Sequence, residues 1–66
     1  MLTIKRLREM VGTEIKFSSN SETINGKLLV VRGQALRDGQ IVVRTDNGKL
    51  VAKNTSKYSK FKLLAG

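Results

Sequence analysis

The chain of 66 residues contains no cysteine, no histidine, no tryptophan and no proline. Without cysteine it forms neither a disulfide nor a thiolate metal site. Without histidine it lacks the commonest metal ligand and the commonest general base. Because proline interrupts the ladders of sheets, its absence leaves every segment able to join one. We therefore expect stability to come from apolar packing, from turns or from oligomerisation.

Long apolar segments are absent as well. The first eight residues, MLTIKRLR, carry charges where a secretory leader needs an apolar run. No stretch of the sequence approaches the ~20 apolar residues of a membrane span. The sequence therefore predicts a cytoplasmic protein without membrane contact, and its length predicts a single domain over residues 1–66.

The sequence contains few residues that could serve in catalysis or in cofactor binding. Nucleophilic hydrolysis needs a nucleophile beside a base, and the carboxylates are scattered along the chain. They are Glu9, Glu14, Glu22, Asp38 and Asp46. The glycine-containing segment 33–39 matches neither a Walker-type loop nor a dinucleotide fingerprint. The sequence predicts no enzyme, with no catalytic residues, no cofactor and no metal site.

Residues 3–11 are predicted to form a short N-terminal helix. Thr3 can cap its start, and Gly12 suits a left-handed terminator. Three apolar residues share one face of this helix: Ile4, Leu7 and Val11. A helix of this length is unstable alone in water, so we expect this apolar face to pack on the rest of the domain.

The remainder of the chain predicts short strands and turns. Strands are expected at residues 14–19, 27–32, 41–45, 49–53 and 61–64. A single 3₁₀ turn is expected at 57–60. Asn25-Gly26 suits a tight turn, or Gly26 a bulge. The four apolar residues 28–31 predict a central strand that is either covered on both faces or bends between sheets.

The fourth of these strands forms a hairpin with the third. Asn47-Gly48 suits a two-residue type I′ turn, which pairs Arg44 with Val51. One face then holds Ile41, Val43, Thr45, Leu50 and Ala52, and the other holds Val42, Arg44, Asp46, Lys49, Val51 and Lys53. A three-residue loop would instead place Lys49 and Lys53 with the apolar residues. We favour the two-residue turn because it separates apolar from charged side chains.

The glycines and strands together resemble a known architecture. In the segment 12–17, Gly12 stands before an alternating strand. A Gly-x-hydrophobic step follows at 25–28, and the alternating segment 41–44 leads to Asn47-Gly48. Over roughly residues 12–64 this arrangement resembles the SH3-like small barrels of the KOW and Sm-like type. The resemblance implies a mainly β fold with a short N-terminal helix and a five-stranded barrel. An OB-like open barrel is the alternative.

Positive charge is the main indication of function. Thirteen Lys and Arg oppose five Asp and Glu, which gives a net charge of +8. Within one face of a strand, side chains two residues apart are ~7 Å from each other, a spacing that suits neighbouring phosphates. Tyr58 can stack on a base. The candidate nucleic-acid-binding residues are Arg44, Lys49, Lys53, Lys57, Tyr58, Lys60, Lys62, Lys5, Arg6 and Arg8.

These observations predict a small basic protein that binds DNA or RNA by following the phosphate backbone, with low sequence specificity. The alternative is a small regulator, of the kind that phages encode, that binds an acidic surface of a host or partner protein. A homo-oligomer is compatible with either function, because a small domain gains by covering its sheet edges.

Overall fold

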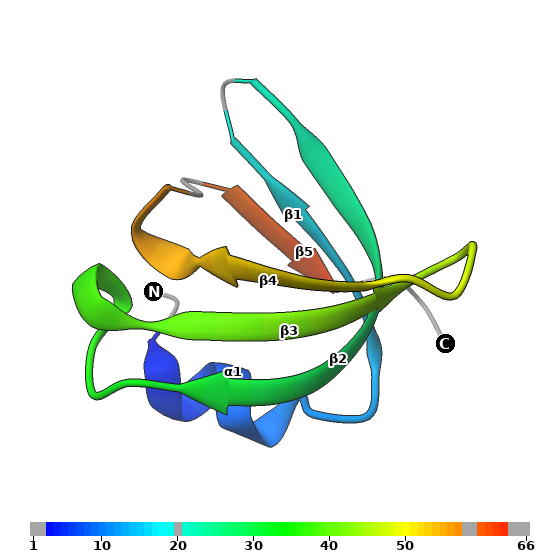
Figure 1. Cartoon of the computed structure of the whole chain (residues 1–66). Coiled ribbons are helices and arrows are strands. Elements are labelled where there is room, and N and C mark those ends of the chain that lie inside the picture. Colours follow the sequence, from blue (N-terminus) through cyan, green and yellow to red (C-terminus); the bar gives the residue numbers. More distant parts are fainter. Residues whose placement is uncertain (1–2, 20, 58–59, 64–66) are drawn as a thin grey trace.

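The computed structural model describes residues 3–19, 21–57 and 60–63, the last four by their backbone (Figure 1). One helix, α1 (Ile4–Glu9), precedes an antiparallel sheet with the strand order β4-β3-β2-β1-β5. The strands are β1 (Glu14–Ser18), β2 (Thr23–Arg32), β3 (Gln40–Thr45), β4 (Leu50–Asn54) and β5 (Lys60–Leu63). Two 3₁₀ turns are η1 (Leu36–Asp38) and η2 (Thr55–Lys57). The predicted class, mainly β with a short N-terminal helix, is confirmed.

The helix begins as predicted and ends earlier. The Thr3 hydroxyl accepts a hydrogen bond from the Arg6 backbone N–H at 3.1 Å, as expected of an N-cap. The last helical residue is Glu9, and Gly12 has a φ of +93°. Because the helix stops there, Met10 is buried instead of Val11, which is 43% exposed. The prediction that Val11 belongs to the packed face is therefore wrong.

The second strand is longer than predicted and joins two ladders. β2 pairs with β1 from Thr23 to Lys27 and with β3 from Gly26 to Arg32. Gly26 is thus neither turn nor bulge, but lies where the two ladders overlap. A bulge between Leu28 and Val30 shifts the register, and β2 curves strongly along its length (Figure 1). The segment bends, as one of the two expectations had it, but it bends within a single sheet and does not pass between two.

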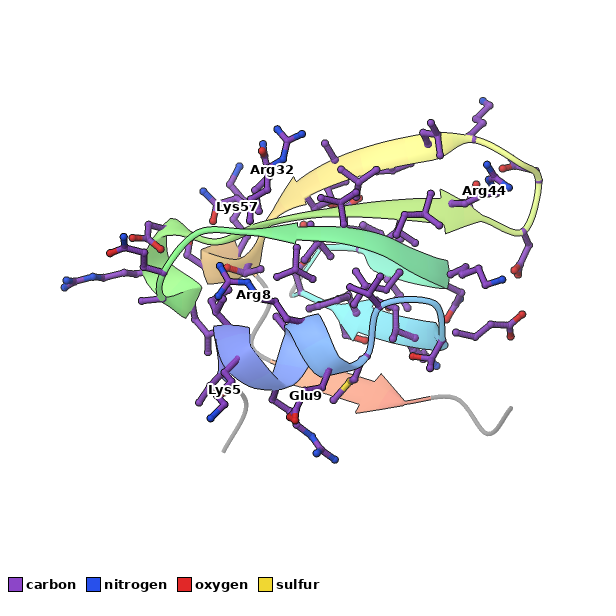
Figure 2. The ribbon with its side chains drawn as sticks, turned by 90° about the horizontal axis from the view of Figure 1, so that it is seen from below. Lys5, Arg8, Glu9, Arg32, Arg44 and Lys57 are labelled. Carbon is purple, nitrogen blue, oxygen red and sulfur yellow. The ribbon has the colours of Figure 1, made fainter. Side chains whose placement is uncertain are left out.

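The core lies on the inner face of the curved sheet, under α1. Ile4 and Leu7 of the helix are buried against sheet residues that are themselves fully covered. Those sheet residues include Ile15, Phe17, Leu28, Ile41 and Val43. On the opposite, outer face Val30 is 38% exposed, so β2 is covered on one face alone. Figure 2 shows α1 lying against the inner side of the sheet.

The β3–β4 hairpin has the register that the sequence argument rejected. Thr45 N–H donates to the Lys49 carbonyl at 2.8 Å and Gly48 N–H to the Thr45 carbonyl at 2.9 Å, which closes a three-residue loop. Gly48 alone in this loop has positive φ, +85°, as in a type I turn followed by a glycine bulge. Val43 therefore faces Val51, and Arg44 faces Leu50. The predicted type I′ turn is wrong.

The three-residue loop is possible because a lysine side chain can be partly buried on the inner face of the hairpin. Lysine stems can lie along apolar surface while their ammonium groups reach water. Lys53 is only partly exposed, so the inner face tolerates it beside Val51. Separating apolar from charged residues was thus too strict a criterion for choosing the register, and a shift of one residue moved every side chain of β4 to the other face.

The last two elements fall slightly earlier than predicted. The 3₁₀ turn occupies 55–57 instead of 57–60, and β5 occupies 60–63 instead of 61–64. Thr55 is buried, its N–H donates to the Gly39 carbonyl at 2.9 Å, and its hydroxyl donates to the Leu36 carbonyl. These bonds fix η2 against η1 and set where the chain leaves β4.

Candidate nucleic-acid interface

The outer face of the sheet is built by the residues that alternate with the core. The register aligns them in three rows across β2, β3 and β4. The rows are Lys27–Arg44–Leu50, Val30–Val42–Ala52 and Arg32–Gln40–Asn54. No described element covers this face, since α1 packs on the opposite one (Figure 2). The outer face is therefore open to a ligand over the width of three strands.

Among the residues whose side chains the structure describes, four cations and one carboxylate occupy this outer face. The cations are Lys16, Lys27, Arg32 and Arg44, and the carboxylate is Glu14, in register with Lys27. Within the described part of the chain none of the four cations forms an ion pair. The two ion pairs of the described residues lie elsewhere, between Arg6 and Glu9 at 3.9 Å and between Lys53 and Glu22 at 3.0 Å.

Lys27 and Arg44 stand directly opposite each other on neighbouring strands. Directly opposed side chains have Cβ atoms ~5 Å apart, and like charges at such positions destabilise a sheet. Both residues are exposed, so water screens part of the repulsion, and Glu14, which is opposite Lys27 on β1, offsets another part. A bound anion would remove it, and the arginine would offer such an anion a planar fork of donors. This pair is the strongest electrostatic indication of a binding surface on the sheet.

The predicted stripe of three hairpin cations does not exist. Arg44 lies on the outer face, whereas Lys49 and Lys53 lie on the inner side of the hairpin. The Lys53 ammonium is bound to the Glu22 carboxylate, which offsets its charge. The three-residue loop is the cause, because it places β4 one residue out of the expected register.

The three cations of α1 differ in whether they already have a partner within the chain. Lys5 is exposed, Arg6 lies 3.9 Å from the Glu9 carboxylate, and Arg8 donates a hydrogen bond to the Gly33 carbonyl. This bond brings Arg8 to the loop that follows Arg32, at the end of β2. Figure 2 shows Arg8, Arg32 and Lys57 at the same end of the domain. The structure thus brings Arg8 and Lys57 to the end of the sheet where Arg32 borders the outer face.

The C-terminal candidates can be placed by backbone alone. Lys60 and Lys62 belong to β5, in register with Ser18 and Lys16 of β1. Their side chains lie outside what the structure describes, and so does the whole of Tyr58. Their predicted contacts with nucleic acid remain predictions.

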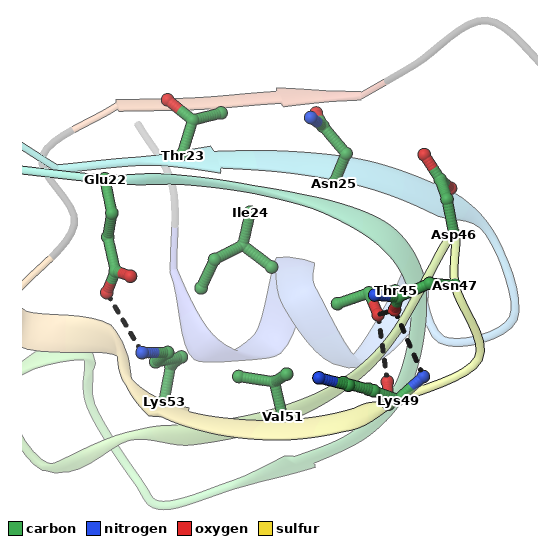
Figure 3. A pocket seen from close by; sticks show the side chains of 10 residues that line it. All are labelled: Glu22, Thr23, Ile24, Asn25, Thr45, Asp46, Asn47, Lys49, Val51 and Lys53. Carbon is green, nitrogen blue, oxygen red and sulfur yellow. Dashed lines mark hydrogen bonds and ion pairs between the residues drawn. The ribbon is translucent and has the colours of Figure 1, made fainter.

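An open groove of about 480 Å³ lies between the start of β2 and the β3–β4 hairpin (Figure 3). Its lining includes two carboxylates and two ammonium groups: Glu22, Asp46, Lys49 and Lys53. Ile24 and Val51 point toward each other across it (Figure 3). Because the opposite charges balance, this groove has little to attract a polyanion, and Lys49 and Lys53 belong to it.

The carboxylate of Asp38 shapes the loop after β2. Its Oδ1 atom accepts hydrogen bonds from the backbone N–H groups of Gln34 at 3.1 Å and Ala35 at 2.7 Å. The bond from Ala35, followed by that from Gln34, lowers the pKa of Asp38 below its ordinary value. Asp38 thus orders a loop, and within the described residues no three acidic side chains gather as a metal site.

For Lys16, Lys27 and Arg32 the sequence left a solvated face and a contact with nucleic acid equally open. Because side chains alternate along a strand, the sequence predicts that Lys27 lies on the face opposite Leu28 and is exposed. The position of Lys27 beside Arg44 depends on the register between β2 and β3, which the alternation within one strand does not determine.

No protein-family model, curated protein or solved structure matches this chain. Among the described residues, no helix has the length and apolar character that crossing a membrane requires.

Proposed function

We propose that this chain is a small nucleic-acid-binding protein that holds phosphate groups against the outer face of its sheet. The observation that carries the proposal is the directly opposed pair Lys27 and Arg44, on a face with four cations and one carboxylate. Two cations side by side on neighbouring strands form a local concentration of positive charge that a polyanion can neutralise.

The proposal includes an SH3-like small barrel as the fold. The strand order β4-β3-β2-β1-β5, the strongly bent β2 and the 3₁₀ turn before β5 support it. In the part of the chain that the structure describes, no pairing joins β4 to β5, so closure between these two strands is itself a proposal.

Low sequence specificity follows from the kind of side chain on this face. Lysine ammonium groups act as point charges, and Arg44 can form a bidentate contact with a phosphate. Apolar residues fill the row between the two cationic rows: Val30, Val42 and Ala52. Two exposed amides, Gln40 and Asn54, border this row, and the Asn54 Oδ1 already accepts hydrogen bonds from Ser56. Such a surface fixes the phosphate backbone and leaves base-edge contacts mainly to Gln40.

The test compares two double variants of equal charge. Lys27→Gln with Arg44→Gln removes two charges from the outer face, and Lys49→Gln with Lys53→Gln removes two from the groove. Binding to labelled single-stranded and duplex DNA and RNA is measured by fluorescence anisotropy across a salt series.

The outer-face variant should reduce the slope of log affinity against log salt by about 1.8 on duplex DNA, at about 0.9 for each phosphate contact. The groove variant should leave the slope nearly unchanged. Equal losses in both variants would show that binding follows net charge and no particular face. No binding of the wild-type chain at about 50 mM salt, where screening is weak, would refute the proposed function.

A second function is favoured by the apolar residues on the same surface. Leu50 is 63% exposed beside Arg44, and Val30 is 38% exposed. Apolar area among cations suits an acidic protein surface better than it suits phosphates, which supports the alternative of a regulator that binds a host or partner protein. Leu50→Ser separates the two functions, because it should weaken a protein contact and spare nucleic-acid binding.

A further inference from the structure

The first residues of β2 are paired on one side alone. Thr23 and Asn25 lie in the ladder with β1, opposite Ser18 and Lys16. The ladder with β3 begins only at Gly26, opposite Thr45, because the chain turns into the hairpin loop after that residue. No strand of the described chain lies on the other side of residues 23–25.

The hydrogen-bond pattern shows which way the backbone groups of these residues point. Leu28 N–H donates to the Thr13 carbonyl at 2.9 Å, and Ser19 N–H donates to the Glu22 carbonyl at 2.8 Å. Hydrogen-bonded and non-hydrogen-bonded pairs alternate in an antiparallel ladder. Thr23 and Asn25 are therefore non-hydrogen-bonded residues toward β1. Their N–H groups point away from it, toward the side where no strand follows.

The groove described above borders this same edge. Its lining includes Thr23, Ile24 and Asn25 on one side, and Lys49, Val51 and Lys53 of the hairpin on the other. Its volume of about 480 Å³ is within the range of about 300–1,000 Å³ that is usual for ligand sites. A segment that followed the β2 edge would pass along the groove and place alternate side chains in it.

The composition of the groove indicates what kind of segment fits. Ile24, which is 7% exposed, and Val51, which packs against the same core, form the apolar part of the lining (Figure 3). The ion pair between Lys53 and Glu22 engages two of the four charged groups. A polyanion finds no excess of cations there. An extended peptide can use the backbone edge for hydrogen bonds and the apolar part of the lining for a side chain, as in strand addition.

We infer that this groove binds an extended segment of an acidic partner protein, which adds to the β2 edge at residues 23–25 as a short strand. An aliphatic side chain of the segment packs on Val51 and on the exposed edge of Ile24. The next side chains along the segment face solvent, and carboxylates there are attracted by the net charge of +8. This site lies apart from the Lys27–Arg44 pair of the outer face, and it does not rest on nucleic-acid binding.

The probe is a fluorescein-labelled octapeptide of alternating valine and glutamate, added to the full chain. Two further peptides complete the set: one with lysine in place of glutamate, and one in which the amides of a single strand edge are N-methylated. Anisotropy measures affinity, and amide hydrogen exchange follows Thr23 and Asn25.

The valine–glutamate peptide should bind best and should slow exchange at Thr23 and Asn25. N-methylation on the pairing edge should weaken binding about tenfold, the loss expected for two backbone hydrogen bonds. No saturable binding at millimolar concentration, or equal binding of the methylated peptide, would overturn the inference.

The matched protein variants are Asn25→Pro and Asn25→Ala. Proline removes an N–H that the ladder with β1 does not use, so it should abolish peptide binding and leave oligonucleotide binding intact. Alanine keeps the N–H and should bind the peptide as the wild-type chain does. If Asn25→Pro does not fold, the methylated peptide still decides the question, because it leaves the protein unchanged. Equal peptide affinity of a folded Asn25→Pro variant would overturn the inference.

Discussion

Replacing Gly26 with alanine tests how β2 passes from one ladder to the other. A Cβ atom at this position would lie 2.8 Å from the carbonyl carbon of Arg44 and 2.9 Å from Cγ1 of Val43. The Arg44 carbonyl is part of the backbone and is held in the β2–β3 ladder, so a change of side-chain rotamer cannot relieve this clash. Relief requires β2 and β3 to separate at the point where the sheet bends.

The expected cost follows from the size of this clash. Overpacking a core typically costs about 1–3 kcal/mol, and a backbone obstacle places Gly26→Ala at the upper end, at about 3 kcal/mol. A chain of this length has a total stability of only about 3–10 kcal/mol. At about 4–8 °C for each kcal/mol in a domain of this size, the midpoint of thermal unfolding should fall by roughly 12–24 °C.

Thermal unfolding followed by circular dichroism measures this shift, and Gly12→Ala provides the control. Gly12 favours glycine for a different reason: its φ is +93°, and a Cβ there would have no neighbour within 4 Å. The control should cost only the conformational strain, about 1 kcal/mol, or roughly 4–8 °C. If the two variants lose the same stability, the close approach of β2 and β3 at Gly26 is not what the position requires.

Three further changes test other contacts. Thr55→Val should cost about 1–3 kcal/mol in chemical denaturation, because it leaves the Leu36 carbonyl without its hydroxyl donor; a loss no larger than that of Ser56→Ala would contradict this. Thr3→Ala should cost about 1 kcal/mol through loss of the N-cap, and Thr3→Ser should restore most of it. Asp38 has a lowered pKa in the folded chain, so its carboxylate stabilises the fold above about pH 4 and loses this effect as the pH falls further. The melting temperature of the wild-type chain should therefore fall more steeply below pH 4 than that of Asp38→Asn, and parallel curves would contradict the role of its backbone contacts.

Local signals in the sequence were sufficient for the class of fold and for most elements. Thr3 and Gly12 bounded the helix, and the alternation around Ile15 and Phe17 located β1. These features depend on neighbours a few residues apart, which is the range over which capping and periodicity act. The N-terminal half of β2 was missed because Thr23 and Asn25 look like loop residues, and only their pairing with β1 makes them strand.

The candidate site depends on contacts that the sequence does not contain. Lys27 and Arg44 are 17 residues apart, and their opposition follows from the β2–β3 register. Glu22 and Lys53 are 31 residues apart, yet they form an ion pair that offsets the charge of Lys53. Counting charges along the chain therefore indicated a basic surface, but it did not show which cations share a face.

This arrangement of the cations sets an expectation for how strongly binding depends on salt. Thirteen basic residues contacting phosphate would give a slope near 12 on duplex DNA, at about 0.9 for each contact. Several cannot contribute fully: Lys53 is bound to Glu22, and Lys49 shares a charge-balanced groove with Asp46. If the outer-face cations Lys16, Lys27, Arg32 and Arg44 carry the contacts, the slope should be about 3.6. A slope near 12 in a salt series would mean that the ligand follows the net charge of the whole chain, and the outer face would then have no special role.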